Sequence, residues 1–199
     1  SRRVAKHFNL NILDSGVLYR LFAYFFNLNI NHQEISDIIK HKIDFKLEKD
    51  SLRILNQDID ITSDLRTEAI AKIASELSSK EEVRNLLFNI QRDFYDTRGL
   101  VADGRDMGTV VFKDAKLKIF LTASPEVRAK RRYLELQNLG QEVNMPALIA
   151  DIKSRDLKDS SRELSPLLAA DDAITIDSSE MSLEEVFSLT ENLIKKEFI

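Results

Sequence analysis

The sequence predicts an α/β fold in which helices flank a parallel sheet. Short apolar runs at residues 10–13, 100–102, 117–121 and 173–176 have the character of buried strands, and segments with helical spacing of apolar residues separate them. Strands that alternate with helices in this way form parallel sheets with helices on both sides. The apolar period changes to two within residues 43–61, which predicts a small antiparallel sheet inserted among the helices.

Composition limits the function classes. With 199 residues, 43% hydrophobic and 31% charged, the chain can bury a core and is expected to form one domain. A net charge of −4 argues against a broad nucleic-acid surface. The absence of cysteine excludes disulfides and thiolate metal sites. No apolar run could span a bilayer and no leader is evident, so we expect a cytoplasmic protein without a membrane partner. We also expect a monomer.

The first elements place two polar residues at a helix start. Residues 1–8 resemble the later part of a helix, and a strand follows them. Asp14-Ser15-Gly16 then predicts a strand-to-helix turn, with the helix running through Asn27. Tyr19 and Arg20 fall in its first turns, where helix N-termini favour anions.

Capping patterns mark the next helices. Asn31 with Glu34, and Ser79 with Glu82, each form a capping-box pattern. They predict helices from residue 31 to about Lys42 and from residue 79 to about 94.

Between these two helices we expect a turn at residues 49–51 and a helical period over 65–77. Ser75 and Arg84 lie off the apolar stripes. Taken by position alone, both are ordinary exposed helix residues.

The loop after the strand at residues 100–102 is the strongest candidate site. Ligands of open α/β sheets bind beyond the carboxyl ends of the strands. Arg105 can grip phosphate oxygens bidentately, Asp106 can accept from an amino group, and Gly104 and Gly108 allow the backbone to approach a ligand. The loop therefore suits a phosphorylated substrate. The alternatives are a simple turn with a surface ion pair, or a metal-binding pair of Asp103 and Asp106 in a phosphohydrolase.

Two charged helices follow. Ser124-Pro125-Glu126 opens a helix that runs to a C′ residue at Gly140, and its basic face at residues 128–132 is either solvated or reaches a nucleotide.

Pro146 opens the next helix. If it continues, Arg155, Asp159 and Arg162 share one side, either as ordinary ion pairs or as part of a closing lid. Ser182 and Glu185 cap the last helix.

Three segments carry a resemblance to a known family. Residues 13–20 (LDSGVLYR), 102–112 (ADGRDMGTVVF) and 155–167 together resemble bacterial cytidylate (CMP) kinases of the nucleoside monophosphate kinase family, and the resemblance runs from end to end. It implies a P-loop-kinase-like parallel sheet with a β insertion and a helical lid in one kinase domain, 1–199. The regions expected are a core (about 1–30, 99–125 and 166–199), a monophosphate-binding region (about 31–98) and a lid (about 126–165).

The resemblance implies transfer of the γ-phosphate of ATP to CMP or dCMP with Mg²⁺. The residues that match phosphate-binding positions are Arg20, Arg105 and Arg162. Those that match other CMP-binding positions are Ser15 and Tyr19 near the nucleotide, Ser75, Arg84 and Asp106 at the cytosine, and Arg155 and Asp159 at the pentose.

Two further roles are our own hypotheses. Arg131 is a candidate ATP contact, and Asp14 or Asp103 could order the water shell of Mg²⁺.

The sequence departs from the family at two places. The phosphate-binding loop pattern G-x-x-x-x-G-K-[GST]-T is absent and would end just before Ser1. We therefore expect that the parent protein has a strand and loop that this sequence omits, and that the chain alone is not a competent kinase. The lid also carries Lys158, Ser160 and Ser161 where relatives often have arginine or asparagine.

Two other functions compete with CMP kinase activity. One is a non-catalytic protein that binds cytidine nucleotides, and the other is a kinase for UMP or another monophosphate. Uracil has a carbonyl where cytosine has an amine, so the presence of both Arg84 and Asp106 argues against UMP.

Overall fold

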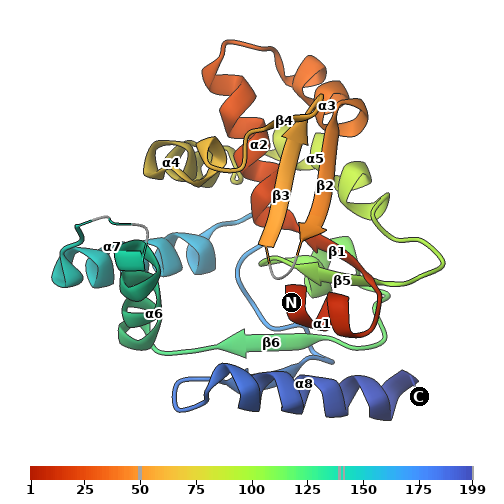
Figure 1. Cartoon of the computed structure of the whole chain (residues 1–199), viewed down its shortest axis with the longest axis vertical. Helices are drawn as coiled ribbons and strands as arrows, with labels where there is room; N and C mark the ends of the chain where they lie inside the picture. The colour runs from red at the N-terminus through yellow and green to blue at the C-terminus, as the bar shows by residue number, and fades with distance from the viewer. Residues whose placement is uncertain (49–50, 139, 141, 199) are drawn as a thin grey trace. The chain divides into compact units, whose positions relative to one another are not determined.

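The computed structural model describes residues 1–48, 51–138, 140 and 142–198 (Figure 1). Its contacts divide the chain into two compact units, Ser1–Met107 and Gly108–Ile199. The first unit contains α1 (Arg2–His7), β1 (Asn11–Asp14), α2 (Ser15–Asn27), α3 (His32–His41), β2 (Ile43–Glu48), β3 (Ser51–Asn56), β4 (Ile59–Asp60), η1 (Asp64–Arg66), α4 (Glu68–Leu77), α5 (Glu81–Arg92) and β5 (Leu100–Asp103). A π-helical turn, η2 (Met107–Val111), spans the division, and the second unit continues with β6 (Ile119–Thr122), α6 (Pro125–Asn138), α7 (Met145–Ser161), β7 (Ile174–Asp177) and α8 (Leu183–Phe198).

The predicted α/β class is confirmed: parallel strands, flanking helices and a small antiparallel sheet are all present. The parallel strands form two pairs, β1 with β5 in the first unit and β6 with β7 in the second. In the first pair Asp14 lies opposite Asp103, each the last residue of its strand. Two carboxylates therefore stand side by side at the carboxyl ends of parallel strands, where the sequence predicted a site.

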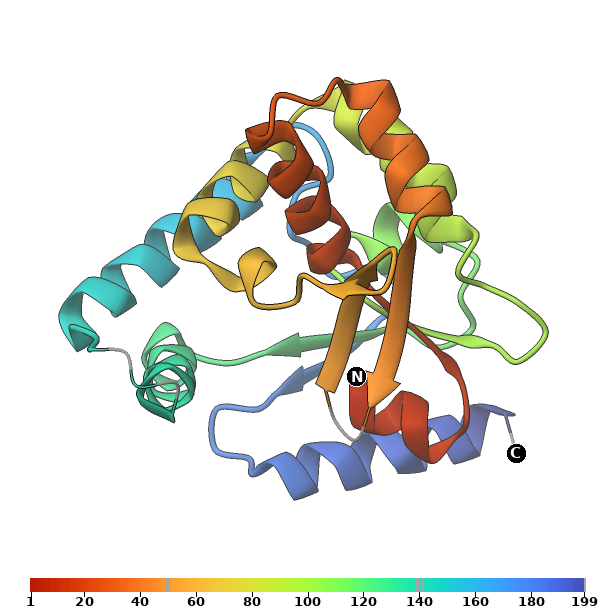
Figure 2. The same cartoon turned by 45° about the horizontal axis from the view of Figure 1, so that its top comes forward.

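Helix α2 forms the core of the first unit. Its apolar side carries Leu18, Leu21 and Phe22, all fully buried, and it packs against α3, α4 and η1 (Figure 2). The carboxylate of Asp14 accepts a hydrogen bond from the Val17 amide at 3.3 Å, which caps the helix as the strand-to-helix turn predicted.

The β insertion is antiparallel, as its period of two predicted. β2 pairs with β3 along its full length, and β3 pairs with β4, which ends at Asp60, one residue before the predicted Ile61. Hydrogen bonds from Thr62 lower the pKa of Asp60 to about 2. Residues 49 and 50 of the predicted turn lie outside the described residues.

In the second unit, α8 runs alongside the β6–β7 pair in both views (Figures 1 and 2). The predicted capping box of Ser182 and Glu185 is confirmed, because each residue bonds the backbone amide of the other, at 2.7 and 3.2 Å. The Ser124 cap is also confirmed: its hydroxyl accepts from the Val127 amide at 3.3 Å. Among the described residues, no helix has the length and apolar character that a membrane crossing requires.

One predicted cap is wrong and one is confirmed in the first unit. Asn31 caps α3, accepting from the Glu34 amide at 2.9 Å. Ser79 does not cap α5: the N-cap is Lys80, without a side-chain bond, and the Ser79 hydroxyl donates to the Glu76 carbonyl at 2.8 Å. The Ser79 hydroxyl therefore bonds the C-terminal end of α4, and it is not available to cap the start of α5.

Two further helix starts differ from the sequence prediction. The helix predicted from Leu65 begins at Glu68, because Thr67 caps it and Leu65 belongs to the short turn η1. Helix α7 begins one residue before Pro146, with Asn144 as its cap.

Helix α7 ends at Ser161, so Arg162 is not helical.

The predicted C′ residue after α6 is confirmed. Gly140 has a positive φ of 73°, and its amide donates to the Gln137 carbonyl at 2.9 Å, as a C′ residue should.

These caps lead to a test by paired substitution. Ser182→Ala removes an N-cap that bonds an amide, so it should lower the free energy of unfolding by about 1 kcal/mol. Ser79→Ala should change it by less than about 0.5 kcal/mol, because Ser79 caps no helix start. Urea unfolding measures both, and a larger loss for Ser79→Ala would contradict the assignment.

Candidate functional site

Arg84 and Asp106 form a buried ion pair in the first unit. Arg84 extends from α5, and Asp106 lies in the loop after β5. The guanidinium Nη2 bonds the Asp106 carboxylate, and its Nη1 donates to the Ser78 carbonyl at 3.0 Å. The two side chains are only 12% and 5% exposed. Position alone predicted an exposed Arg84, and that prediction is wrong because the loop after β5 covers it.

Burial makes this pair expensive to maintain. Removing two charges from water costs several kcal/mol per ion, and their attraction repays it only with good geometry and further hydrogen bonds. An apolar pair of similar volume would often be as stable. The pair places a fixed donor and a fixed acceptor together beside the end of β5.

Ser15 and Gly104 hold the same loop against the start of α2. The Ser15 side chain is buried, and its hydroxyl accepts from Gln91 Nε2 at 3.2 Å. A Cβ on Gly104 would lie 2.8 Å from Ser15 Cβ and 3.0 Å from Met107 Cγ. The loop thus needs glycine at this position in order to pack.

The structure shows a packing role for the two glycines, which the sequence did not predict. Protein atoms already fill the space beside them: Ser15 and Met107 lie next to Gly104, and the Lys118 side chain would be 3.2 Å from a Cβ added at Gly108. Their small size therefore lets the chain pack closely at both positions. Gln91 was not predicted, since a glutamine inside a helical pattern gives no sequence signal.

The remaining predicted residues of the first unit lie on the elements expected. Arg20, on α2, donates from Nη1 to the Leu65 carbonyl at 2.8 Å, and Tyr19 beside it is buried. Ser75 lies on α4, half-buried, with its carbonyl bonded by the Ser78 hydroxyl at 2.8 Å. Arg105 is half-buried in the loop itself.

Asp14 and Asp103 both bond protein groups. Asp14 pairs with Arg2 at 3.0 Å, and Asp103 accepts from the Ser1 hydroxyl at 2.7 Å. Among the described residues there is no group of three or more His, Cys, Asp or Glu that could hold a metal ion. The two carboxylates present only oxygen donors, which suits contact with a hydrated Mg²⁺ through its waters.

A second cluster lies in the second unit. Asp159 is buried, with Arg155 Nε at 3.9 Å from one carboxylate oxygen and Arg162 Nη1 at 3.6 Å from the other. The helix ends at Ser161, so the shared helix face that a continuing helix would give does not include Arg162. The chain turns back after Ser161 instead.

This turn keeps Arg162 beside Asp159. The Arg162 Nε bonds the Ser165 carbonyl, and the Leu167 amide donates to the Asp159 carbonyl at 2.8 Å. Ser165 has a positive φ of 49°, an unusual conformation for a residue with a side chain. The trio therefore consists of two helical residues and the C-cap residue that follows them.

Arg131, the candidate ATP contact, bonds the protein in this structure. Its guanidinium donates to the Ser178 hydroxyl at 3.2 Å and carbonyl at 2.7 Å. It thereby joins α6 to the loop after β7, at the carboxyl end of a parallel strand.

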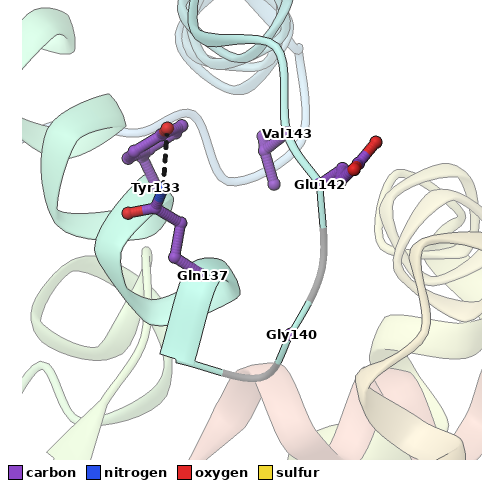
Figure 3. Close-up of a pocket in the computed structure, with 5 residues that line it drawn as sticks. All are labelled: Tyr133, Gln137, Gly140, Glu142 and Val143. Atoms are coloured by element: carbon purple, nitrogen blue, oxygen red, sulfur yellow. Dashed lines mark hydrogen bonds between the residues drawn. The ribbon is translucent and has the colours of Figure 1, made fainter.

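A hollow of about 450 Å³ lies near the end of α6 (Figure 3). Its lining residues are Tyr133, Gln137, Gly140, Glu142 and Val143, and none of them is a predicted site residue. The Gln137 amide donates to the Tyr133 hydroxyl at 2.8 Å, so the two polar groups that face each other there are paired.

An α/β fold with carboxylates at parallel strand ends, a buried Arg–Asp pair and a second arginine cluster suits the binding of phosphorylated ligands. Comparison with known proteins gives the family. The family model described as cytidylate kinase matches residues 1–196. The chain belongs to the cytidylate kinase family.

Individual relatives agree. The chain is 41% identical over 204 residues to a cytidylate kinase of Acinetobacter baylyi, covering 96% of this chain and 88% of the relative. It is 44% identical over 190 residues to one of Pseudomonas aeruginosa, covering 92% and 83%. It is 39% identical over 203 residues to one of a Shewanella species, covering 98% and 88%.

The packing of Gly104 gives the prediction for this site. Gly104→Ala should lower the free energy of unfolding by about 1–3 kcal/mol, because its Cβ would overlap Ser15. Gly16→Ala is the matched control: its Cβ would meet only Asp14 Oδ1, at an ordinary 3.4 Å. In a helix this change should be neutral or stabilising by up to about 1 kcal/mol. Equal effects in urea unfolding would contradict the close packing at Gly104.

Proposed function

We propose that this protein transfers the γ-phosphate of ATP to CMP or dCMP, giving CDP or dCDP. The observation that carries the proposal is the buried Arg84–Asp106 pair beside the end of β5. Membership of the cytidylate kinase family supports the reaction class. We also propose that it acts in the cytoplasm as a monomer, with no nucleic-acid or membrane partner.

Cytosine fits the chemistry of this pair. Its exocyclic amine donates to the Asp106 carboxylate, and its ring nitrogen and carbonyl accept from the Arg84 guanidinium. A carboxylate has about four acceptor sites and a guanidinium five donors, so both can bind a base while remaining paired. Uracil presents a carbonyl where the amine would be, and a buried carboxylate facing it is penalised.

Arginine side chains would bind the phosphates and neutralise their charge. Phosphoryl transfer depends on positioning and on cancelling charge rather than on a protein nucleophile. Arg20, Arg105 and Arg162 are assigned to phosphate, with Ser15 and Tyr19 beside the nucleotide at the start of α2. Mg²⁺ bound with ATP would neutralise phosphate charge, with Asp14 or Asp103 ordering its water shell.

The second cluster is assigned to the sugar. Arg155 and Asp159 would reach the pentose, and Ser75 would join Arg84 and Asp106 at the base. Use of both ribose and deoxyribose forms follows if these contacts do not depend on the 2′-hydroxyl. Arg131 remains the candidate on the ATP side, so Arg131→Ala should affect the use of ATP or nothing.

The test is a coupled assay of ADP release with ATP and Mg²⁺. Full-length protein that contains the phosphate-binding loop, with its intact mass verified, is offered CMP, dCMP, UMP and AMP. We expect turnover with CMP and dCMP and little with the others. Asp106→Asn keeps the side-chain volume but removes the charge, and should lower kcat/KM for CMP by roughly 100-fold. Asp37→Asn, on the exposed face of α3, is the control.

Two results would overturn the proposal. Binding of CMP without turnover would indicate a non-catalytic cytidine-nucleotide protein. Equal use of UMP and CMP would show that Arg84 and Asp106 do not read the base.

A further inference from the structure

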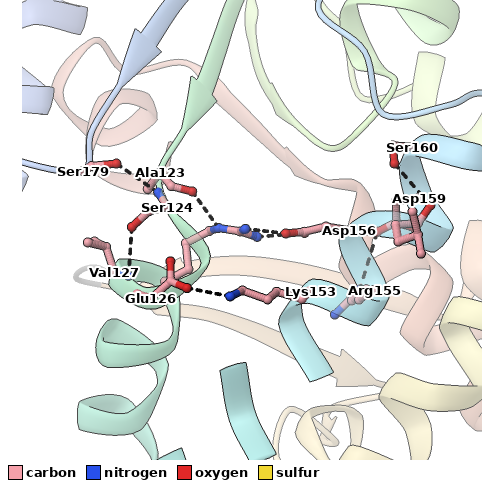
Figure 4. A network of polar contacts seen from close by, with 12 residues as sticks. Ala123, Ser124, Glu126, Val127, Lys153, Arg155, Asp156, Asp159, Ser160 and Ser179 are labelled. Atoms are coloured by element: carbon pink, nitrogen blue, oxygen red, sulfur yellow. Dashed lines mark hydrogen bonds and ion pairs between the residues drawn. The ribbon is translucent and has the colours of Figure 1, made fainter. Parts of the chain in front are cut away.

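An ion pair joins α6 to α7 in a way that the roles above do not use. Arg128 on α6 and Asp156 on α7 meet through two parallel bonds: Nη1 to Oδ1 at 2.8 Å, and Nη2 to Oδ2 (Figure 4). The remaining nitrogen, Nε, donates to the Ala123 carbonyl at 3.0 Å. We call Arg128, Asp156 and the Ala123 carbonyl the clasp.

One side of the clasp is fixed to the sheet. Ala123 follows the last residue of β6, and the next residue, Ser124, caps α6 through the Val127 amide. The Ser124 amide in turn donates to Ser179 Oγ at 2.9 Å, in the loop after β7. The start of α6 is therefore tied to the ends of both strands.

The other side of the clasp holds the residues assigned to the sugar. Asp156 directly follows Arg155 and precedes Asp159 by three residues, which is less than one helical turn. Any rotation or tilt of α7 that breaks the clasp moves Arg155 and Asp159 with it. The clasp therefore links the position of both side chains to the end of β6.

A neighbouring ion pair provides the comparison. Lys153 and Glu126 also join α7 to α6, at 2.7 Å, but their side chains are 55% and 56% exposed. Exposed pairs contribute little, because water and salt screen them and two flexible side chains must be ordered. The clasp is more enclosed, at 36% and 29%, and its bidentate fork fixes an orientation as well as a distance.

We propose that Arg128 and Asp156 are positioning residues that hold α7 on α6 so that Arg155 and Asp159 meet the pentose of the nucleotide substrate. The inference rests on the function proposed above. It does not require Arg128 to touch a nucleotide.

Kinetics of Asp156→Asn and Arg128→Gln provide the first test. Each should raise KM for CMP by about tenfold while KM for ATP and kcat change by less than about threefold, since a displaced contact weakens CMP binding first. The double variant should be no worse than either single one, because both remove the same interaction. Arg128→Lys keeps the positive charge but cannot form the two parallel bonds, so its KM for CMP should lie between those of the parent and Arg128→Gln. Lys153→Gln is the matched control and should leave all constants unchanged.

A distance measurement tests the clasp without any activity. The sequence has no cysteine, so Leu134→Cys on α6 and Leu157→Cys on α7, both exposed, give two unique sites for spin labels. Pulsed electron paramagnetic resonance should give a narrow distribution of the distance between the two labels in the labelled protein without further substitution, and also in Lys153→Gln. Asp156→Asn should broaden or shift it.

The outcomes separate the clasp from the function. If Asp156→Asn leaves both the distances and KM for CMP unchanged, the clasp does not position α7. If Arg128→Gln raises KM for ATP while Asp156→Asn has no effect, Arg128 acts on the nucleotide directly and the inference is wrong. A parent protein without CMP turnover would overturn the proposed function, while the distance measurement would still decide whether the clasp holds the helices.

Discussion

A guanidinium and a carboxylate buried against each other are the interaction on which the candidate site depends. Arg84 reaches Asp106 only because α5 lies against the loop after β5, and the same loop packs on Ser15 at Gly104. Removing one partner would leave the other charge uncompensated, at a cost of about 3–5 kcal/mol. Asp106 must therefore keep its charge opposite Arg84, and position 104 must remain glycine because Ser15 packs against it.

The second unit uses charge differently. Asp159 is buried between two arginines, Arg155 on the helix and Arg162 directly after its end, and the Ser165 carbonyl holds the Arg162 guanidinium. The bidentate ion pair of Arg128 and Asp156 fixes the orientation of α7 relative to α6. Charges that are paired within the protein arrive already ordered, so less conformational entropy is lost when a charged substrate binds. In both units the arginines assigned to the substrate, where their bonds are described, are held by carbonyl or carboxylate oxygens.

Local chemistry explains what could be predicted from the sequence. The caps at Asn31 and Ser182 and the alternating strands of the insertion depend on neighbours in the chain, and all were predicted. The Ser79 cap failed because two helices compete for one hydroxyl. The burial of Arg84 and the Gln91–Ser15 bond join residues 22 and 76 positions apart, which no local pattern contains. The roles of Arg84, Ser75 and the lid residues came from family resemblance rather than from spacing.

The most direct test of the account is isothermal titration of CMP and UMP, without ATP, into the parent protein and Asp106→Asn. We predict that the parent binds CMP about 100-fold more tightly than UMP, and that the folded Asp106→Asn protein loses most of this preference. The circular dichroism spectrum and the unfolding midpoint establish that the variant is folded. A folded Asp106→Asn protein that keeps the full preference for CMP would contradict the claim that the buried pair reads the base.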